Sequence, residues 1–146
     1  MSIEIEHKYL VTDESYKRMA FKALDIRQGY LSRVPERTVR VRTKGEKGYL
    51  TVKGKNEGDS RLEFEYEVPL ADAVEMLGLC EKGILEKTRW FVDYEGLTWE
   101  IDEYHGAKEG LTVAEVEIPQ SGMEYHKPPF IGKNVTGDPA YYNSNL

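Results

Sequence analysis

The sequence holds very little cysteine. Cys80 is the single cysteine in 146 residues, so no disulfide can form within the chain, and this usage fits a reducing compartment. Long apolar runs are missing as well, because none approaches the roughly 18 residues that a membrane-spanning helix needs. The first residues lack a basic region followed by an apolar run, so no secretory signal peptide is expected. These absences predict a cytoplasmic protein that does not cross a membrane.

An excess of basic residues is also missing. Lys and Arg number 20 against 26 Asp and Glu, which gives a formal net charge of −6 at pH 7. That balance argues against binding to a nucleic acid duplex or to an anionic membrane over a broad surface, although it leaves room for a local basic pocket. Ten Tyr, four Phe and two Trp argue against disorder. The length fits a single domain over residues 1–146 that can bury a sizeable core.

Most of the chain alternates apolar and polar residues with a period of two, which is typical of β-strands. Short turns that contain Gly or Pro separate most of these segments, which favours antiparallel pairing. The expected strands span residues 2–11, 27–33, 37–44, 48–55, 61–68, 84–94, 97–104 and 111–118.

Two segments change to helical spacing. The first covers residues 13–24, with Thr12 or Asp13 as its N-cap. The second covers residues 69–77, where Pro69 suits the first turn and Gly78 suits the position just after the helix. Residues 128–146 have a mixed pattern, for which we expect a short helix or turn and then a tail that packs back on the body.

Charged residues gather on one face of almost every expected strand, because successive side chains of a strand point to opposite faces. In the first strand Glu4, Glu6 and Lys8 share a face, and Ile3 and Ile5 share the other. The bases of the charged faces are Lys8, Arg40, Arg42, Lys44, Lys53, Lys55, Arg61, Lys87 and Arg89, and the acids are Glu4, Glu6, Glu63, Glu65, Glu67, Glu100, Asp102, Glu115 and Glu117.

These charged faces have two interpretations. They can be the solvated side of an ordinary antiparallel sheet, which is apolar inside and polar outside. They can instead line the inside of an inverted barrel, since a barrel of about eight strands can hold one small ligand. Paired carboxylates at i and i+2 repel each other unless a positive group lies between them. Bases bind phosphate oxygens and clustered carboxylates bind hard cations, so such a lumen suits a polyanion with divalent cations. The alternation itself is compatible with both.

A family resemblance favours the inverted barrel. The segment Glu4-Ile5-Glu6-His7-Lys8 resembles the Glu-x-Glu-x-Lys signature of the CYTH domain, the triphosphate tunnel metalloenzyme superfamily. Further segments resemble the family in the same order along nearly the whole chain. They are Gln28-Gly29-Tyr30-Leu31, Arg40-Val41-Arg42, Leu50-Thr51-Val52-Lys53-Gly54, Glu63-Phe64-Glu65-Tyr66-Glu67, Lys87-Thr88-Arg89-Trp90, Trp99-Glu100-Ile101-Asp102, Gly110-Leu111, Ala114-Glu115-Val116-Glu117 and Gly132-Lys133-Asn134-Val135-Thr136, followed by Asp138, Tyr141 and Asn143.

The resemblance implies an α+β fold that is mainly β, with a closed antiparallel barrel of about eight strands around a charged tunnel and with helices packed outside. It implies a triphosphate bound in the lumen together with Mg²⁺ or Mn²⁺. Members of the family hydrolyse inorganic triphosphate, thiamine triphosphate or an RNA 5′-triphosphate end, and some convert ATP to cyclic AMP. The short, single-domain bacterial branch resembles inorganic triphosphatases best.

The resemblance also implies residue roles. The expected catalytic residues are Glu4, Glu6, Lys8 and Lys87. The expected substrate-binding residues are Lys8, Arg40, Arg42, Lys53, Lys87 and Arg89. The expected metal ligands are Glu4, Glu6, Glu63, Glu65, Asp102, Glu115 and Glu117. Two positions depart from the family pattern: His7, expected on the outer face, replaces a common Arg, and Ala140 occupies a place where the tail often carries an Arg.

The sequence thus predicts a metal-dependent triphosphatase whose partner is a small triphosphate, most simply inorganic tripolyphosphate. Two alternatives stay open. One is a class IV-type adenylyl cyclase on the same fold, which needs space for a nucleoside outside the triphosphate site. The other is a module that binds polyphosphate or nucleotides without catalysis. The sequence leaves both a monomer and a homodimer open.

Overall fold

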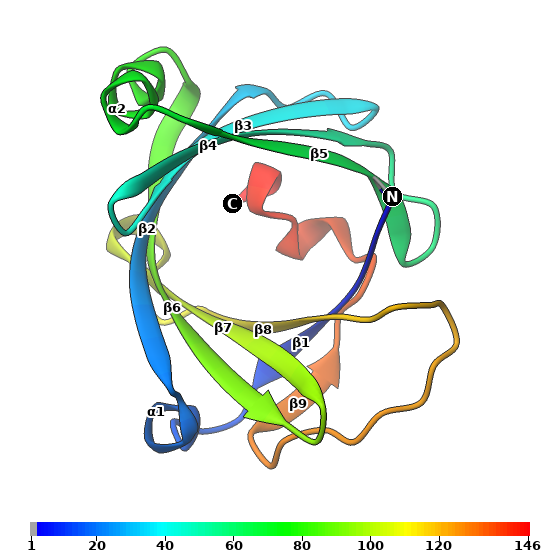
Figure 1. Cartoon of the computed structure of the whole chain (residues 1–146). Helices are drawn as coiled ribbons and strands as arrows, with labels where there is room; N and C mark the ends of the chain where they lie inside the picture. Colours follow the sequence, from blue (N-terminus) through cyan, green and yellow to red (C-terminus); the bar gives the residue numbers. More distant parts are fainter. Residues whose placement is uncertain (1–2) are drawn as a thin grey trace.

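The computed structural model describes residues 3–146, and a single antiparallel sheet of nine strands dominates it. The strand order is β5-β4-β3-β2-β6-β7-β8-β1-β9, and a further pairing of β5 with β1 closes eight of these strands into a barrel (Figure 1). The expected closed antiparallel barrel is therefore confirmed. The strands are β1 (Ile3–Val11), β2 (Lys22–Ser32), β3 (Arg37–Lys44), β4 (Lys47–Gly54), β5 (Ser60–Val68), β6 (Glu81–Tyr94), β7 (Leu97–His105), β8 (Thr112–Glu117) and β9 (Ile131–Asn134).

The helix expected over residues 13–24 is largely wrong. Only α1 (Tyr16–Met19) is helical there, and Ser15 rather than Thr12 or Asp13 is its N-cap. Residues 22–24 of that segment belong to β2, which begins at Lys22 and pairs with β6, and the remaining residues form turns and bends. Pairing with a long neighbouring strand has overridden the local helical spacing, as tertiary context often does. β9 is a further strand that the alternation did not predict.

The helix expected over residues 69–77 is confirmed as α2 (Leu70–Leu77). It packs outside the barrel, where Ala73 and Leu77 bury against Val41 of β3. Gly48 permits this close approach, because a Cβ added there would lie 2.7 Å from the Cβ of Ala73. Gly78 caps the helix in a right-handed conformation with φ of −69°. The helix therefore does not end in a left-handed glycine.

The apolar faces of the strands point outward and form the core between the barrel and its covering segments. The largest cluster includes Tyr9, Trp99, Ile101, Val116 and Phe130, and it is covered by α1 and by the chain between β8 and β9. The charged faces therefore point into the barrel. This is the reverse of an ordinary sheet, and it confirms the inverted arrangement.

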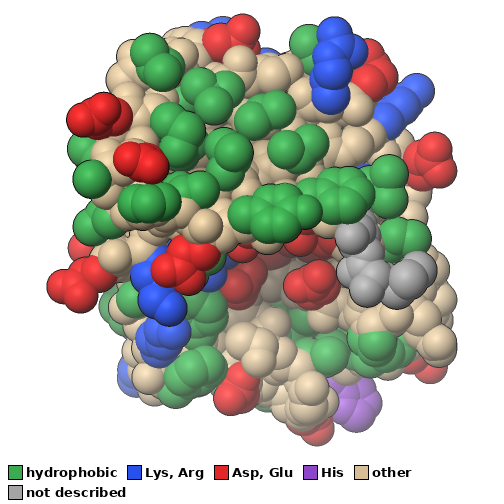
Figure 2. All heavy atoms as spheres, turned by 45° about the horizontal axis from the view of Figure 1, so that its top comes forward, with side chains coloured by type: hydrophobic (Ala, Val, Ile, Leu, Met, Phe, Trp, Pro, Cys, Tyr) green, Lys and Arg blue, Asp and Glu red, His purple; other side chains and the backbone are tan. Residues whose placement is uncertain are grey.

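The barrel is only partly sealed between β1 and β5. Residues 3–5 pair with residues 60–62, and beyond Leu62 no strand of residues 3–146 pairs with that side of β5. Leu62, Phe64 and Tyr66 of β5 are exposed apolar residues, and Figure 2 shows a hollow in the surface below a broad apolar area. This hollow gives the lumen an opening to solvent.

The chain ends inside the ring of strands. Two short 3₁₀ turns, η2 (Pro139–Tyr141) and η3 (Asn143–Asn145), lie within the barrel when it is viewed along its axis (Figure 1). A third 3₁₀ turn, η1 (Gly106–Lys108), joins β7 to β8. Over residues 3–146, no helix has the length and apolar character needed to cross a membrane.

Candidate active site

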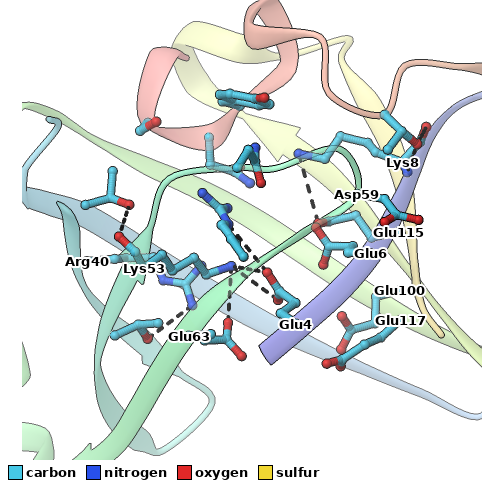
Figure 3. A pocket seen from close by; sticks show the side chains of 18 of the residues that line it. Glu4, Glu6, Lys8, Arg40, Lys53, Asp59, Glu63, Glu100, Glu115 and Glu117 are labelled. Carbon is cyan, nitrogen blue, oxygen red and sulfur yellow. Dashed lines mark hydrogen bonds and ion pairs between the residues drawn. The ribbon is translucent and has the colours of Figure 1, made fainter. Parts of the chain in front are cut away.

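A cavity of about 260 Å³ lies inside the barrel. Eleven of the thirteen residues assigned to the site from the sequence line it, from β1, β3, β4, β5, β6 and β8 (Figure 3). They are Glu4, Glu6, Lys8, Arg40, Arg42, Lys53, Glu63, Glu65, Arg89, Glu115 and Glu117. The period-two alternation therefore brings the predicted residues to one space.

Strand β1 supplies three of these side chains because its alternate residues face the lumen. Glu4 lies opposite Arg61 in the register, Glu6 opposite Glu117 and Lys8 opposite Glu115. Two of these pairs thus join an acid with a base across a strand boundary, and the third, Glu6 with Glu117, places two acids opposite each other.

Three carboxylates converge where β1, β5 and β8 come together. Oxygens of Glu4, Glu63 and Glu117 all lie within 4.8 Å of one another. Burial and the neighbouring carboxylates raise the pKa of Glu117 and, against the attraction of Lys53, that of Glu63. Burial would also raise the pKa of Glu4, but Lys53 outweighs it and the pKa of Glu4 lies below its ordinary value.

This carboxylate cluster suits a divalent cation. Hard oxygen ligands at this spacing are what Mg²⁺ and Mn²⁺ prefer, and a cation would relieve the mutual repulsion of the acids. Lys53 borders the cluster, since its Nζ lies 3.0 Å from Glu4 Oε1 and 3.2 Å from Glu63 Oε2. The divalent-metal dependence implied by the family therefore fits the residues present.

Glu6 and Glu115 form a second acidic pair deeper in the lumen. Burial and the adjacent Glu115 raise the pKa of Glu6 well above its ordinary value. Lys8 and Arg89 approach Glu115, with Lys8 Nζ 4.0 Å from Oε2 and Arg89 Nη2 3.6 Å from Oε1. Burial would also raise the pKa of Glu115, but Lys8, Glu6 and Arg89 lower it well below its ordinary value, so the two carboxyl groups are shifted in opposite directions.

The bases of β3 surround a single carboxylate. Nη2 of Arg40 and Nη2 of Arg42 each lie 3.2 Å from Glu65 Oε2, and the hydroxyl of Thr51 donates to the same oxygen at 2.6 Å. Burial and the neighbouring Arg40 and Arg89 lower the pKa of Arg42 to about 10. The lumen here holds positive charge that one carboxylate does not balance, which is the condition for binding a further anion.

Lys87 and Asp102 lie behind the cavity wall rather than on it. Both side chains are fully buried, with Lys87 Nζ 2.7 Å from Asp102 Oδ2. Asp102 also accepts two hydrogen bonds from Arg89, at 2.7 Å from Nε and 2.9 Å from Nη2. Burial would raise the pKa of Asp102, but Arg89 and Lys87 lower it to about 2, and burial lowers the pKa of Lys87 to about 8. This geometry orients Arg89; a direct contact of Lys87 with substrate or of Asp102 with metal stays a prediction.

Several lining residues were not assigned to the site from the sequence. Lys44, Arg61 and Glu100 occupy the charged faces, so the alternation marks them, and Thr38 and Thr51 follow the same parity. Loop and tail residues carry no such periodic signal. They are Asn56, Gly58, Asp59, Val135, Thr136, Gly137, Tyr142, Asn143 and Ser144.

His7 lies on the outer face of β1, as expected, and supports one of these loops. Its Nε2 is 2.8 Å from Asp59 Oδ2, and its Nδ1 is 2.6 Å from the hydroxyl of Tyr125. Asp59 also accepts a hydrogen bond from Ser121. His7 thereby connects the loop between β4 and β5 to the chain that follows β8.

The comparisons with known proteins agree with this geometry. The chain matches the CYTH domain family over residues 2–142. It is 50% identical to an inorganic triphosphatase of Acetivibrio thermocellus, over all of this chain and 94% of that protein. It is 30% identical to an inorganic triphosphatase of Nitrosomonas europaea, over 98% of this chain and 95% of that protein. The crystal structure of the inorganic triphosphatase NE1496 superposes with a TM-score of 0.65 and 28% identity, over 97% of this chain and 92% of that one. The chain therefore belongs to the CYTH domain family.

Proposed function

We propose that this protein is an inorganic triphosphatase that hydrolyses tripolyphosphate inside its barrel, with Mg²⁺ or Mn²⁺ as the divalent cation. The observation that carries the proposal is one cavity inside the barrel that a carboxylate cluster and a group of bases line together. Two full-length relatives, at 50% and 30% identity, bear the same activity in their names. A small triphosphate matches this lining better than an apolar ligand does. We also propose that the chain forms one domain, because the barrel includes strands from both halves of the chain.

In this proposal the bases hold the phosphate oxygens. The side chains of Arg40, Arg42 and Arg89 suit bidentate contacts, whereas Lys8 and Lys53 act as point charges. Lys87 and Asp102 act without touching the substrate, because their ion pairs fix the direction in which Arg89 points. Phosphoryl transfer depends mainly on this kind of positioning and charge neutralisation.

The proposed metal ligands are the converging carboxylates Glu4, Glu63 and Glu117, with Glu6 and Glu115 next to them. When bound there, a divalent cation neutralises phosphate charge and lowers the pKa of water. Lys53 is one of the proposed phosphate-binding bases and lies between the carboxylates and the bases of β3. The proposed phosphate site and the proposed metal ligands are therefore adjacent.

A cyclase has less support from the lining of the cavity. Two aromatic side chains, Tyr30 and Tyr142, line it. The ring of Tyr30 lies 5.0 Å from the guanidinium of Arg33, and the hydroxyl of Tyr142 donates to the carbonyl of Gly137. Arg33 therefore covers one face of the buried Tyr30 ring, which leaves little surface there on which an adenine base would stack.

One assay tests the proposal. Phosphate release and cyclic AMP formation are measured with tripolyphosphate and with ATP, each with Mg²⁺ and with Mn²⁺. We expect the higher kcat/KM for tripolyphosphate and no cyclic AMP. Cyclic AMP formed from ATP with the higher kcat/KM would favour the cyclase, and binding without turnover of either compound would favour a non-catalytic module.

A further inference from the structure

The pairing of β1 with β5 is the shortest of the pairings that close the barrel. It covers residues 3–5 of β1 and residues 60–62 of β5, whereas every other pairing in the ring includes at least five residue pairs. The three converging carboxylates come from β1, β8 and β5, namely Glu4, Glu117 and Glu63. The position of Glu63 relative to the other two therefore depends on how firmly β5 is held at this short pairing.

Asp59, the residue just before β5, extends this pairing. Its carbonyl accepts a hydrogen bond from the amide of Glu6 on β1 at 3.0 Å. Its Oδ2 lies 2.8 Å from Nε2 of His7, also on β1, and its Oδ1 accepts a hydrogen bond from Ser121 Oγ at 2.8 Å. Ser121 belongs to the chain that follows β8. Asp59 thus connects the start of β5 to β1 and to the chain after β8, and these three strands supply the carboxylates.

Asp59 lines the cavity, but its carboxylate is engaged elsewhere. One oxygen pairs with His7 and the other with Ser121, and neither of these residues lines the cavity. Asp59 is also not among the three carboxylates whose oxygens lie within 4.8 Å of one another. Its contacts are therefore those of a residue that holds strands together rather than those of a metal ligand.

The contact with His7 continues into the apolar core. Nδ1 of His7 lies 2.6 Å from the hydroxyl of Tyr125, which lies 2.5 Å from the hydroxyl of Tyr9. Tyr9 is buried in the largest apolar cluster outside the strands. Asp59 is consequently linked to a well-packed part of the molecule.

We propose that Asp59 is a positioning residue for the metal site, which holds β5 against β1 and β8 so that Glu63 stays beside Glu4 and Glu117. This inference rests on the proposed function. The groups of a site must be held within about 0.5 Å of their productive geometry. Three residue pairs are a weak restraint on a strand whose edge is unpaired beyond Leu62 within residues 3–146. The contacts of Asp59 supply the missing restraint.

Two substitutions of Asp59 separate position from charge. Asp59→Ala removes both side-chain hydrogen bonds and leaves the carbonyl in place. Asp59→Asn removes the charge, but its amide can still accept from Ser121 and bond to His7. Ser121→Ala is a milder third variant that removes one of the two bonds. The matched control is Asp93→Ala, because Asp93 also accepts a hydrogen bond from a hydroxyl, that of Thr98, and does not line the cavity.

The first measurement is the Kd of Mg²⁺, by calorimetric titration into the protein without tripolyphosphate. The second is the Mg²⁺ concentration that gives half-maximal hydrolysis of tripolyphosphate. We expect Asp59→Ala to raise both about 3–10-fold, less than the roughly 10–100-fold typical of losing a direct partner of a metal ligand. Ser121→Ala should raise them less, Asp59→Asn should retain most of the affinity, and Asp93→Ala should match the wild type. A residue that only stabilised the fold would lower Tm and leave the Kd of the folded protein unchanged.

The outcomes separate this inference from the proposed function. If the wild-type protein binds Mg²⁺ but does not hydrolyse tripolyphosphate, the proposed function fails, and the calorimetric series alone decides the role of Asp59. If the wild-type protein hydrolyses tripolyphosphate and folded Asp59→Ala binds Mg²⁺ equally well, the inference is wrong and the proposed function stands.

Three further results would overturn the positioning role. Equal losses in Asp59→Ala and Asp59→Asn would mean that the charge of Asp59, not its contacts, supports binding. Absence of Mg²⁺ binding to the wild-type protein would remove the carboxylate cluster as a metal site. Should Asp59→Ala fail to fold by circular dichroism, Ser121→Ala decides, and an unchanged Kd there contradicts the inference.

Discussion

At the scale of single residues, the site depends on carboxylates that are held close together against their mutual repulsion. Glu4, Glu63 and Glu117 approach within 4.8 Å, and the pKa of Glu117 is raised by burial and by the neighbouring acids. Such an arrangement costs stability in the absence of a cation, so it indicates a role in binding one.

Glu117→Gln tests that role. A neutral amide is a weaker ligand for a hard cation, so the Mg²⁺ concentration that gives half-maximal activity should rise about 10–100-fold. Calorimetric titration of Mg²⁺ into the protein without tripolyphosphate provides a readout that does not depend on turnover. The control is Glu109→Gln, an exposed acid outside the barrel lumen. An unchanged titration in Glu117→Gln would remove this residue from the metal site.

Asp102 gives a residue-scale prediction for pH. Its pKa is lowered to about 2 by Arg89 and Lys87, against the effect of burial, from an ordinary value of 3.8. A carboxylate with a lowered pKa stabilises the fold above the unfolded value, and that stability is lost as pH falls through the folded value. Stability should therefore drop between about pH 4 and pH 2.

The matching measurement is the free energy of unfolding at several pH values. In Asp102→Asn we expect lower stability near neutral pH and a flatter profile over this range, because the titrating group is gone. Asp72→Asn, on the exposed face of α2, should leave the profile unchanged. An equally steep profile in Asp102→Asn would mean that other carboxyl groups cause the acid sensitivity.

At the scale of elements, most of the eight barrel strands could be predicted because one face is apolar and the other charged. The same parity located eleven site residues. The alternation does not indicate how deeply a side chain is buried. It therefore assigned Lys87 and Asp102 to the charged face of their strands but could not predict that they lie behind the wall of the cavity. β9 escaped prediction because it is short and depends on distant partners, such as the bond from the Val135 amide to the Lys8 carbonyl. The expected tail that packs back on the body is present as two 3₁₀ turns, with Tyr141 and Leu146 against a buried cluster.

The contact of α2 with β4 is a further prediction at this scale. A Cβ at Gly48 would lie 2.7 Å from the Cβ of Ala73 and 3.1 Å from the carbonyl oxygen of Val68. Gly48→Ala should therefore push α2 outward and destabilise the fold by about 1–3 kcal/mol. Gly83→Ala is the control, because a Cβ there meets nothing within 4 Å. Denaturant unfolding measures both, and equal stability of the two variants would contradict the close packing.

At the scale of the whole molecule, the inverted barrel keeps the apolar core, which stabilises the fold, apart from the charged lumen. Its apolar core lies outside the strands, between the barrel and α1, α2 and the chain from β8 to β9. Its lumen is polar and contributes little apolar burial. Seven bases and eight acids line the cavity, namely Lys8, Arg40, Arg42, Lys44, Lys53, Arg61 and Arg89 with Glu4, Glu6, Asp59, Glu63, Glu65, Glu100, Glu115 and Glu117. The charges thus nearly balance.

That balance predicts how ligands affect stability. Tripolyphosphate alone would add several negative charges to a nearly neutral lumen, and uncompensated charge is costly where water is restricted. Mg²⁺ supplied with it restores the balance. Saturation at about 100 times Kd stabilises a fold by about 2.7 kcal/mol, and a chain of about 150 residues gains roughly 2–4 °C in Tm per kcal/mol. We therefore expect Tm to rise by about 5–10 °C with both ligands together. The rise should be much smaller with either one alone.

Sulfate with Mg²⁺ at equal ionic strength is the control for a general salt effect. If tripolyphosphate raised Tm equally with and without Mg²⁺, charge balance in the lumen would not govern binding.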